Sequence, residues 1–385
     1  MKKSLSKLTD NKKIFLFFLF SEFLNLSILL ITNYLKPINK LFSFDNNSWG
    51  ILRSYGNFDG FHYWHIAKDG YGLYQEAFFP LYPVLIKISS FFTNTYFING
   101  LIISNISFAL LLFIIFKLIR VTEDKSTTWW FLIFFLSFPT SFFLTSYYTE
   151  STFLLFFTLS LYFLTKEKYL SSSIFGYFAA LTRFIGLFTV IPIFIYLLTE
   201  RKKLNFRKIA VLFSPVLGFL SYSTYLYIVK GDFLLFINTQ PSFGANRSNH
   251  LILLPQVMYR YLKILLTFKL DITYFVAILE LSVFSIFLLV LLYQLYSYFK
   301  KRIEIPKNKG LRILVGLNLF SLTNLLLPTL SGTLSSIPRY ALLSLSFFIF
   351  LAAIKSVRIK FTIAVIFIIT HIILFKLFLE GIFIG

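Results

Sequence analysis

The stretch IFLFFLFSEFLNLSILLITNY, from Ile14 to Tyr34, decides the fold class of this chain. It contains a single charged residue, Glu22, and it is as long as the roughly 20 residues that a helix needs to cross a bilayer. It lacks a small-residue cleavage site, so we interpret it as a first membrane-spanning helix and not as a secretory signal peptide.

The whole composition agrees with that stretch. The 385 residues are 57% hydrophobic and 14% charged, whereas a soluble domain carries roughly 25% charged residues. The chain has no cysteine, which excludes a disulfide framework, a thiol nucleophile and a thiolate metal site. We therefore expect an all-α polytopic membrane protein that forms a single domain over residues 1–385, without a separate soluble domain.

Further apolar runs predict about eleven spanning helices. They are expected near 14–34, 96–116, 128–146, 150–165, 171–182, 187–199, 209–229, 272–299, 312–328, 340–354 and 361–380.

Basic residues predict the orientation of these helices. The chain has 37 Lys and Arg against 16 acidic residues, but the basic residues form short clusters between apolar runs and not one patch. This pattern is typical of the positive-inside rule, so we expect no nucleic-acid partner. If the N-terminus is cytoplasmic, most of these clusters lie in the connections on the cytoplasmic side of the membrane. The loops near 36–95, 230–271 and 329–339 would then lie on the outer face.

The densest group of polar residues lies in the first of these loops, in FDGFHYWHIAKDGY (58–71) and AFFPLYP (77–83). The mixture of aromatic and polar residues predicts a helix in the membrane interface, with Asp59 at its start and Gly70 at its end. Such an aspartate is suited to accept a proton from an acceptor hydroxyl. It is equally suited to cap the helix, which is the commoner role, and the spacing leaves both open.

His62 and His65 share one face of the predicted helix and have the spacing of a metal-ligand pair. Hydrogen-bonded imidazoles in the interface are the simpler interpretation, because no further ligands lie close by. The loop also lacks a DxD pair, so we expect no metal and no cofactor.

The two quoted stretches closely resemble the first outer loop of the PIG-V family, the mannosyltransferases that add the second mannose in GPI-anchor assembly. The family commonly has Trp where this chain has Phe58. The resemblance implies the GT-C fold, a polyprenyl-phosphate-linked sugar donor, and Asp59 as the catalytic base. Weaker matches follow in the family's order, at YTES (148–151), ALTRFIG (180–186), Gly231-Asp232 with Gln240, and SIPRY (336–340).

Arginines at the ends of apolar helices are the further residues that we expect in the site. Guanidinium groups bind phosphate through paired donors, so we expect Arg183 and Arg339 to bind the donor phosphate, with Arg247 a weaker candidate. Pairing with a carboxylate or a lipid headgroup is the alternative for each. Glu150 is expected either to be a second acid of the site or to fix Arg183. The remaining expected substrate contacts are His62, Tyr63, His65, Tyr82 and Gln240.

Together these features predict an inverting transfer of mannose or another hexose to a glycan, lipid or protein acceptor at the outer membrane face. The bias towards Lys, Asn, Ile and Phe indicates an AT-rich genome, and we expect a prokaryotic source. Membrane lipids are expected partners of the chain. Two other classes remain open. One is a lipid or polysaccharide transporter or flippase, and the other is a non-catalytic partner subunit with the same fold.

Overall fold

The computed structural model describes residues 9–35, 50–93, 95–199, 205–244, 247–248, 250–302, 304–305 and 308–384. Outside the described residues lie 1–8 and 200–204, which belong to connections predicted to be cytoplasmic, and 36–49 of the first predicted outer loop.

The described residues form only helices, with no strand among them. The α-helices are α2 (Asp10–Leu35), α3 (Asp59–Asp69), α4 (Leu81–Thr93), α5 (Tyr96–Thr122), α6 (Lys125–Ser137), α7 (Glu150–Thr165), α8 (Tyr169–Thr182), α9 (Val190–Thr199), α10 (Phe206–Lys230), α11 (Leu235–Asn238), α12 (Leu254–Thr267), α13 (Ile272–Lys300), α14 (Lys309–Leu326), α15 (Ile337–Ala341), α16 (Leu345–Ala353) and α17 (Val357–Leu379). Short 3₁₀ helices join them at η1 (Gly50–Gly56), η2 (Gln75–Ala77), η3 (Ser141–Leu144), η4 (Phe184–Thr189), η5 (Gln240–Phe243) and η6 (Leu327–Ser331).

Six of the helices found in the described residues are long and apolar enough to cross a membrane: α2, α5, α10, α13, α14 with η6, and α17. Their outer faces are apolar, with Phe23 of α2 and Leu289 of α13 both 69% exposed and Phe361 of α17 66% exposed. Large apolar side chains exposed on this scale are typical of a surface that contacts lipid. The chain therefore has the helices and the surface of a helical membrane protein.

The other five predicted spans coincide with shorter helices. The run near 128–146, for example, is divided between α6 and η3, because Pro139 cannot continue a helix. The two predicted outer loops near 36–95 and 230–271 are more helical than we expected: α4 occupies part of the first, and α12 part of the second. Both begin with a proline in the first turn or just before it, where the missing N–H costs nothing.

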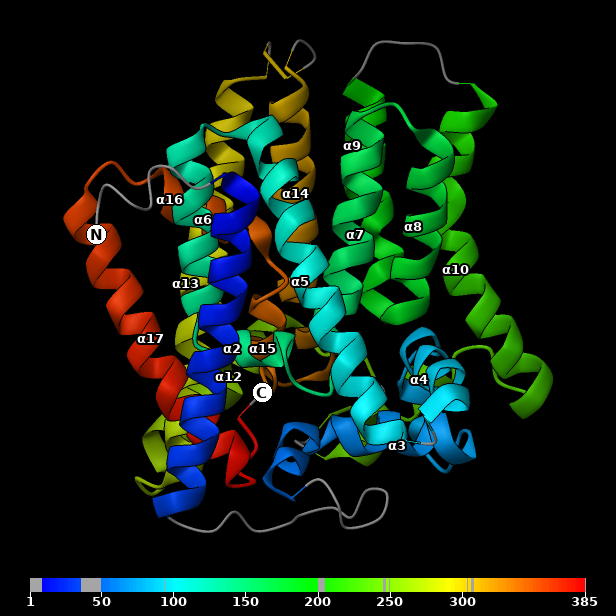
Figure 1. The fold of residues 1–385 in the computed structure, drawn as a ribbon, viewed down its shortest axis with the longest axis vertical. Coiled ribbons are helices and arrows are strands. Elements are labelled where there is room, and N and C mark those ends of the chain that lie inside the picture. The colour runs from blue at the N-terminus through cyan, green and yellow to red at the C-terminus, as the bar shows by residue number, and fades with distance from the viewer. Residues whose placement is uncertain are drawn as a thin grey trace.

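The helices run mostly along the long axis of the molecule (Figure 1). The upper end in that view carries the N-terminal ends of α2, α10, α14 and α17, whereas α3 and α4 lie at the lower end. In sequence, the ends gathered at the top are rich in Lys and Arg. The arrangement thus separates the basic helix ends from the first predicted outer loop.

Hydrogen bonds join the segment before α3 to the segment before α7. The N–H of Tyr147 donates to the carbonyl of Tyr55 at 3.0 Å, and the hydroxyl of Tyr148 donates to the carbonyl of Asn57 at 2.6 Å. Gly60 lies against the Tyr147 carbonyl, which a Cβ would approach to 3.1 Å. These contacts fix the start of α3 beside the start of α7.

Two further bonds position α15. The hydroxyl of Thr140 donates to the carbonyl of Pro338 at 2.8 Å, and the side chain of Asn324 donates to the carbonyl of Tyr340 at 2.7 Å. The N-cap of α15, Ser336, has a φ of 69°, in the left-handed region that few non-glycine residues adopt. The short helix that carries Arg339 is therefore held from both sides.

Candidate active site

Asp59 is the first residue of α3. The N-cap is Phe58, which makes no side-chain cap bond and has a φ of 59°. A non-glycine residue in this region costs on the order of 1–3 kcal/mol, which the surrounding contacts must offset. The helix thus begins at Asp59, as the sequence predicted, but Phe58 and not Asp59 occupies the N-cap position that the capping alternative requires.

The carboxylate of Asp59 pairs with Arg339. Nη1 of Arg339 donates to Oδ2 of Asp59 at 2.5 Å, and the side chain of Asp59 remains 27% exposed. The Arg339 side chain is only 4% exposed, and its guanidinium lies 4.6 Å from the ring centre of Tyr148 and 5.2 Å from that of Phe143. Contacts of a guanidinium with aromatic rings at these distances are favourable, and they help to hold the Arg339 side chain in place.

Glu150, the first residue of α7, holds two arginines at once. Its Oε1 accepts a bond from Nε of Arg339 at 2.5 Å and one from Nη1 of Arg183 at 2.6 Å. The side chain is fully buried, and its Oε2 has no hydrogen-bond partner among the described residues. Of the two roles expected for Glu150, this geometry favours the fixing of arginines, and it extends that role from Arg183 to Arg339.

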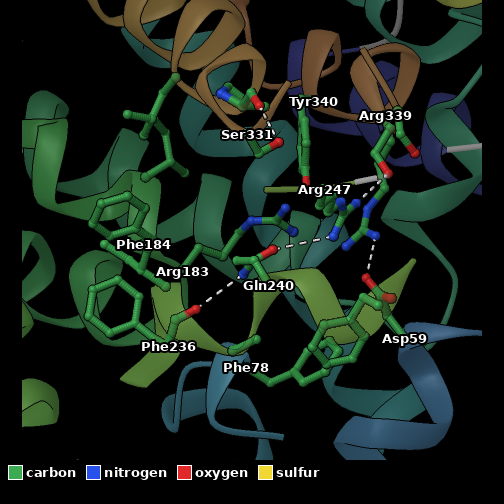
Figure 2. A pocket seen from close by; sticks show the side chains of 18 of the residues that line it. Asp59, Phe78, Arg183, Phe184, Phe236, Gln240, Arg247, Ser331, Arg339 and Tyr340 are labelled. Atoms are coloured by element: carbon green, nitrogen blue, oxygen red, sulfur yellow. Dashed lines mark hydrogen bonds and ion pairs between the residues drawn. The ribbon is translucent and has the colours of Figure 1, made fainter. Parts of the chain in front are cut away.

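Arg183 extends from the C-terminal end of α8. Besides Glu150, its Nη1 reaches the hydroxyl of Thr149 at 2.9 Å, and the side chain is 11% exposed. Its guanidinium points towards Gln240 and Arg247 in Figure 2, and lies 5.9 Å from the ring centre of Tyr340. Arg183 is thus anchored by one nitrogen, with the rest of its fork directed into the cavity.

Arg247 completes a group of three arginines. Its Nη1 donates to Oε1 of Gln240 at 3.3 Å, and its Nη2 lies 3.5 Å from the hydroxyl of Ser336. Gln240 in turn donates to the carbonyl of Phe236 at 3.2 Å. Arg247, the weaker candidate in the sequence, therefore lies beside Arg183 and Arg339 (Figure 2). Gln240 accepts a hydrogen bond from it.

Three guanidinium groups against two carboxylates leave the site with an excess of one positive charge. Burial raises the pKa of the Asp59 carboxyl, but the charge of Arg339 and its hydrogen bond outweigh this and lower that pKa below its usual value. Asp59 is therefore an ionised proton acceptor at neutral pH. The surplus positive charge suits the site to an anion.

These groups surround one cavity of about 800 Å³. Asp59, Arg183, Arg247 and Arg339 line it, and so does Tyr63. Much of the remaining wall is apolar and comes from Phe78, Phe79, Phe184, Ile185, Phe236, Ile237, Phe243, Leu251, Leu327, Pro328 and Leu330. A ligand that fits must therefore combine an anionic group with apolar parts.

The other expected contacts divide into two groups. His62 and Tyr63 line the cavity, and the hydroxyl of Tyr63 lies 3.4 Å from that of Thr149. Tyr82 does not line it: this side chain is fully buried, and its hydroxyl donates to the carbonyl of Gly100 at 2.9 Å. His65 also does not line the cavity, and its Nδ1 lies 3.1 Å from Oε1 of Gln75. The structure therefore does not place Tyr82 and His65 among the residues that could contact a ligand in the cavity.

The two histidines do not converge on a metal position. Each has its Nδ1 close to the side chain of Gln75, at 3.3 Å for His62 and 3.1 Å for His65. Among the residues that the structure describes, no group of three His, Asp or Glu side chains has the arrangement of a metal site. The second interpretation of this pair, as hydrogen-bonded imidazoles, matches the geometry.

Sequence reasoning missed Gln75, Thr149 and Phe143. Thr149 belongs to the YTES stretch and directly precedes Glu150, so its place in that motif is a signal in the sequence. Gln75 and Phe143 carried no signal, because neither lies in a motif or at a charged position.

Compared with known proteins, the chain matches no protein-family model, and no curated protein is significantly similar to it in sequence.

Proposed function

We propose that this protein is a membrane-embedded glycosyltransferase of the GT-C type, with about eleven membrane-spanning helices, that uses a polyprenyl-phosphate-linked sugar. The observation that carries the proposal is the meeting of Asp59, Arg183 and Arg339 around one cavity of about 800 Å³. A proton acceptor and an excess of guanidinium groups in one partly apolar space are what an anionic, lipid-linked donor requires.

The reaction is a single displacement at the anomeric carbon of the donor. The acceptor oxygen forms a bond to that carbon while the bond from the carbon to the phosphate oxygen breaks. The hydroxyl proton passes to the carboxylate of Asp59, and the bonding pair leaves with the polyprenyl phosphate. Attack from the face opposite the phosphate inverts the anomeric centre.

Arginines stabilise the departing phosphate. Arg183 offers the part of its fork that is not bonded to Glu150 or Thr149, and Arg247 offers a second guanidinium from the loop after η5. Arg339 is engaged by both carboxylates, so its contribution is mainly to place Asp59 and to add positive charge. Groups fixed before the reaction stabilise the developing charge without reorganisation.

The proposal places the cavity at the outer face of a prokaryotic cell membrane, with the N-terminus in the cytoplasm. The support is the separation of basic helix ends from α3 and α4 in Figure 1, together with the positive-inside rule. The acceptor, whether glycan, lipid or protein, would then meet the donor sugar outside the cytoplasm. A transporter is the less favoured alternative, because it should carry its charges near the bilayer midplane.

The direct experiment supplies the purified protein with radiolabelled polyprenyl-phosphate mannose or polyprenyl-phosphate glucose and a membrane extract. We expect label to move from one donor into a new product, and to stay in the donor when the Asp59→Asn variant replaces the wild type. Equal transfer by both proteins would exclude Asp59 as the base. Binding of the donor without any transfer would favour a carrier or a non-catalytic partner subunit instead.

A further inference from the structure

The side chain of Gln75 lies between the two histidines of α3 and bonds to both. Its Nε2 is 3.3 Å from Nδ1 of His62, and its Oε1 is 3.1 Å from Nδ1 of His65. A third bond joins the same Oε1 to the backbone N–H of Gly72 at 2.9 Å. Gln75 is 6% exposed, so these bonds form away from bulk solvent.

The bond from Gly72 fixes which end of the amide faces which histidine. A backbone N–H can only donate, so the atom that receives it must be the carbonyl oxygen of Gln75. Turning the amide over would place its NH₂ group against this N–H, two donors in contact. The NH₂ group therefore faces His62, and the carbonyl oxygen faces His65.

This orientation selects the tautomer of His62. The NH₂ group of Gln75 donates, so Nδ1 of His62 must accept and carries no proton. In the neutral ring the proton then resides on Nε2, which has no hydrogen-bond partner among the described residues. The ring is held in place by stacking on Phe78 at 4.9 Å and by an edge contact with Phe243 at 5.5 Å.

The surroundings of His62 also keep the ring neutral. Burial lowers its pKa below the usual value, and this outweighs the raising effect of Asp59, while His65 adds a further lowering effect. The rings of Phe78, which follows η2, and of Phe243 in η5 pack against the imidazole. The acidic residue of η2, Glu76, is buried and pairs with Lys230 at 3.3 Å. A neutral ring has only one proton to place, so the choice of nitrogen matters.

We infer that Gln75 is a positioning residue that holds His62 as an Nε2–H donor directed into the cavity, where it binds the oxygen of the acceptor hydroxyl whose proton Asp59 removes. His62 follows Asp59 by three residues on α3, so both project from the same face of the helix, and both line the cavity. The tautomer rests on the geometry alone. The role towards the acceptor rests on the proposed function.

The pair formed by His62 and Asp59 recognises a hydroxyl specifically. A hydroxyl oxygen accepts from Nε2–H of His62 while its proton is donated to the carboxylate of Asp59. An acceptor in which that hydroxyl is methylated could satisfy His62 but not Asp59.

The tautomer is measured directly by ¹⁵N NMR of the detergent-solubilised protein labelled at histidine. The chain has only four histidines, so the spectrum of a His62→Gln variant assigns His62 by subtraction. At neutral pH we expect a proton on Nε2 and none on Nδ1. In Gln75→Glu the carboxylate accepts and cannot donate, so Nδ1 should become protonated. A proton on Nδ1 in the wild type, or the same tautomer in both proteins, would overturn the inference.

Transfer from polyprenyl-phosphate mannose to a membrane extract tests the role in the reaction. Gln75→Glu should lower turnover roughly tenfold at alkaline pH, about the worth of one buried hydrogen bond, and lowering the pH should restore it because the doubly protonated ring regains Nε2–H. Gln75→Met should show a loss without this restoration. Gln256→Glu adds the same charge at an exposed site of α12 and should leave turnover unchanged.

Equal, pH-independent losses in Gln75→Glu and Gln75→Met would reduce Gln75 to a structural link and overturn the role of His62. A wild-type protein that transfers no label from any donor would instead contradict the proposed function. The NMR result is independent of activity and would still decide whether Gln75 selects the tautomer. The two failures are therefore distinguishable.

Discussion

Nη1 of Arg339 lies 2.5 Å from Oδ2 of Asp59, although 280 residues separate them in the chain. The bond joins the start of α3 to the short helix α15, and both residues line the cavity. It has two consequences: the aspartate stays ionised, and the arginine cannot move without releasing it. The charge of Asp59 and the position of Arg339 therefore depend on each other.

The first prediction concerns pH. Arg339 lowers the pKa of Asp59 despite burial, so the acid limb of kcat/KM should lie below the usual carboxyl range. The same carboxylate stabilises the fold through the neutral range and loses this contribution only as the pH falls through the lowered pKa. In Arg339→Lys, which lacks the planar fork, the limb should move to higher pH. The pH profile of transfer measures this shift. An acid limb at the same pH in both proteins would show that Arg339 does not set the pKa of Asp59.

The second prediction concerns Glu150. Glu150→Gln removes the only charge between Arg183 and Arg339, and breaking a buried pair costs about 3–5 kcal/mol. Glu167→Gln is the matched control, because Glu167 pairs with Lys309 at a site where both side chains are well exposed, and should cost under about 1 kcal/mol. Denaturant unfolding in detergent measures both. Similar losses in the two variants would mean that the buried cluster adds no special stability.

The third prediction concerns the donor phosphate. Arg183→Lys keeps the charge but loses the planar fork, so donor binding should weaken while the fold is kept. Arg312→Lys is the control, since Arg312 is a similarly buried arginine at the start of α14, outside the cavity. Arg339→Ala should instead destabilise the protein, because it leaves Asp59 unpaired and removes one of the two arginines bonded to Glu150. Unchanged donor affinity in Arg183→Lys, measured by equilibrium binding of polyprenyl-phosphate mannose, would exclude Arg183 from the phosphate site.

The fourth prediction concerns orientation. Cysteines can be added singly to this cysteine-free chain at Leu73, which is 78% exposed, and at Lys301, which is exposed after α13. A membrane-impermeant thiol reagent applied to intact cells should label the cysteine at 73 and leave that at 301 unlabelled until the membrane is opened. Labelling of both in intact cells would contradict the assignment of α3 and α4 to the outer face.

The sequence predicted features that depend on neighbouring residues. Apolar runs indicated eleven of the observed helices but not α4 or α12. The polar-aromatic mixture with Gly70 predicted α3, which begins at Asp59 and ends at Asp69. Features that depend on packing between distant segments were not predictable. The pairing of Asp59 with Arg339, the burial of Tyr82 and the displacement of the cap to Phe58 all arise from such contacts.

The same distinction, between features visible in the sequence and features that depend on packing, applies to the residues of the candidate site. Charged residues in an apolar chain are conspicuous, so Asp59, Glu150, Arg183 and Arg339 could be selected from the sequence. Gln75 could not, because a glutamine in a loop gives no periodic or charge signal. Its importance is visible only where Gly72 and the two histidines surround it.

The central claim is that Asp59 removes the acceptor proton, and the Asp59→Asn variant isolates it. Asparagine keeps the shape and an oxygen that accepts from Arg339, but it cannot take up a proton. Removal of one negative charge also leaves the cavity more positive. Donor affinity should therefore stay the same or increase, which separates this variant from the arginine variants.

The most direct measurement is single-turnover transfer from polyprenyl-phosphate mannose by Asp59→Asn, with its unfolding free energy measured separately. We expect a native-like fold and a rate roughly 10²–10⁴-fold below the wild type, the usual worth of general-base catalysis. A near-normal rate in the folded variant would contradict the account and show that Asp59 serves only to hold Arg339.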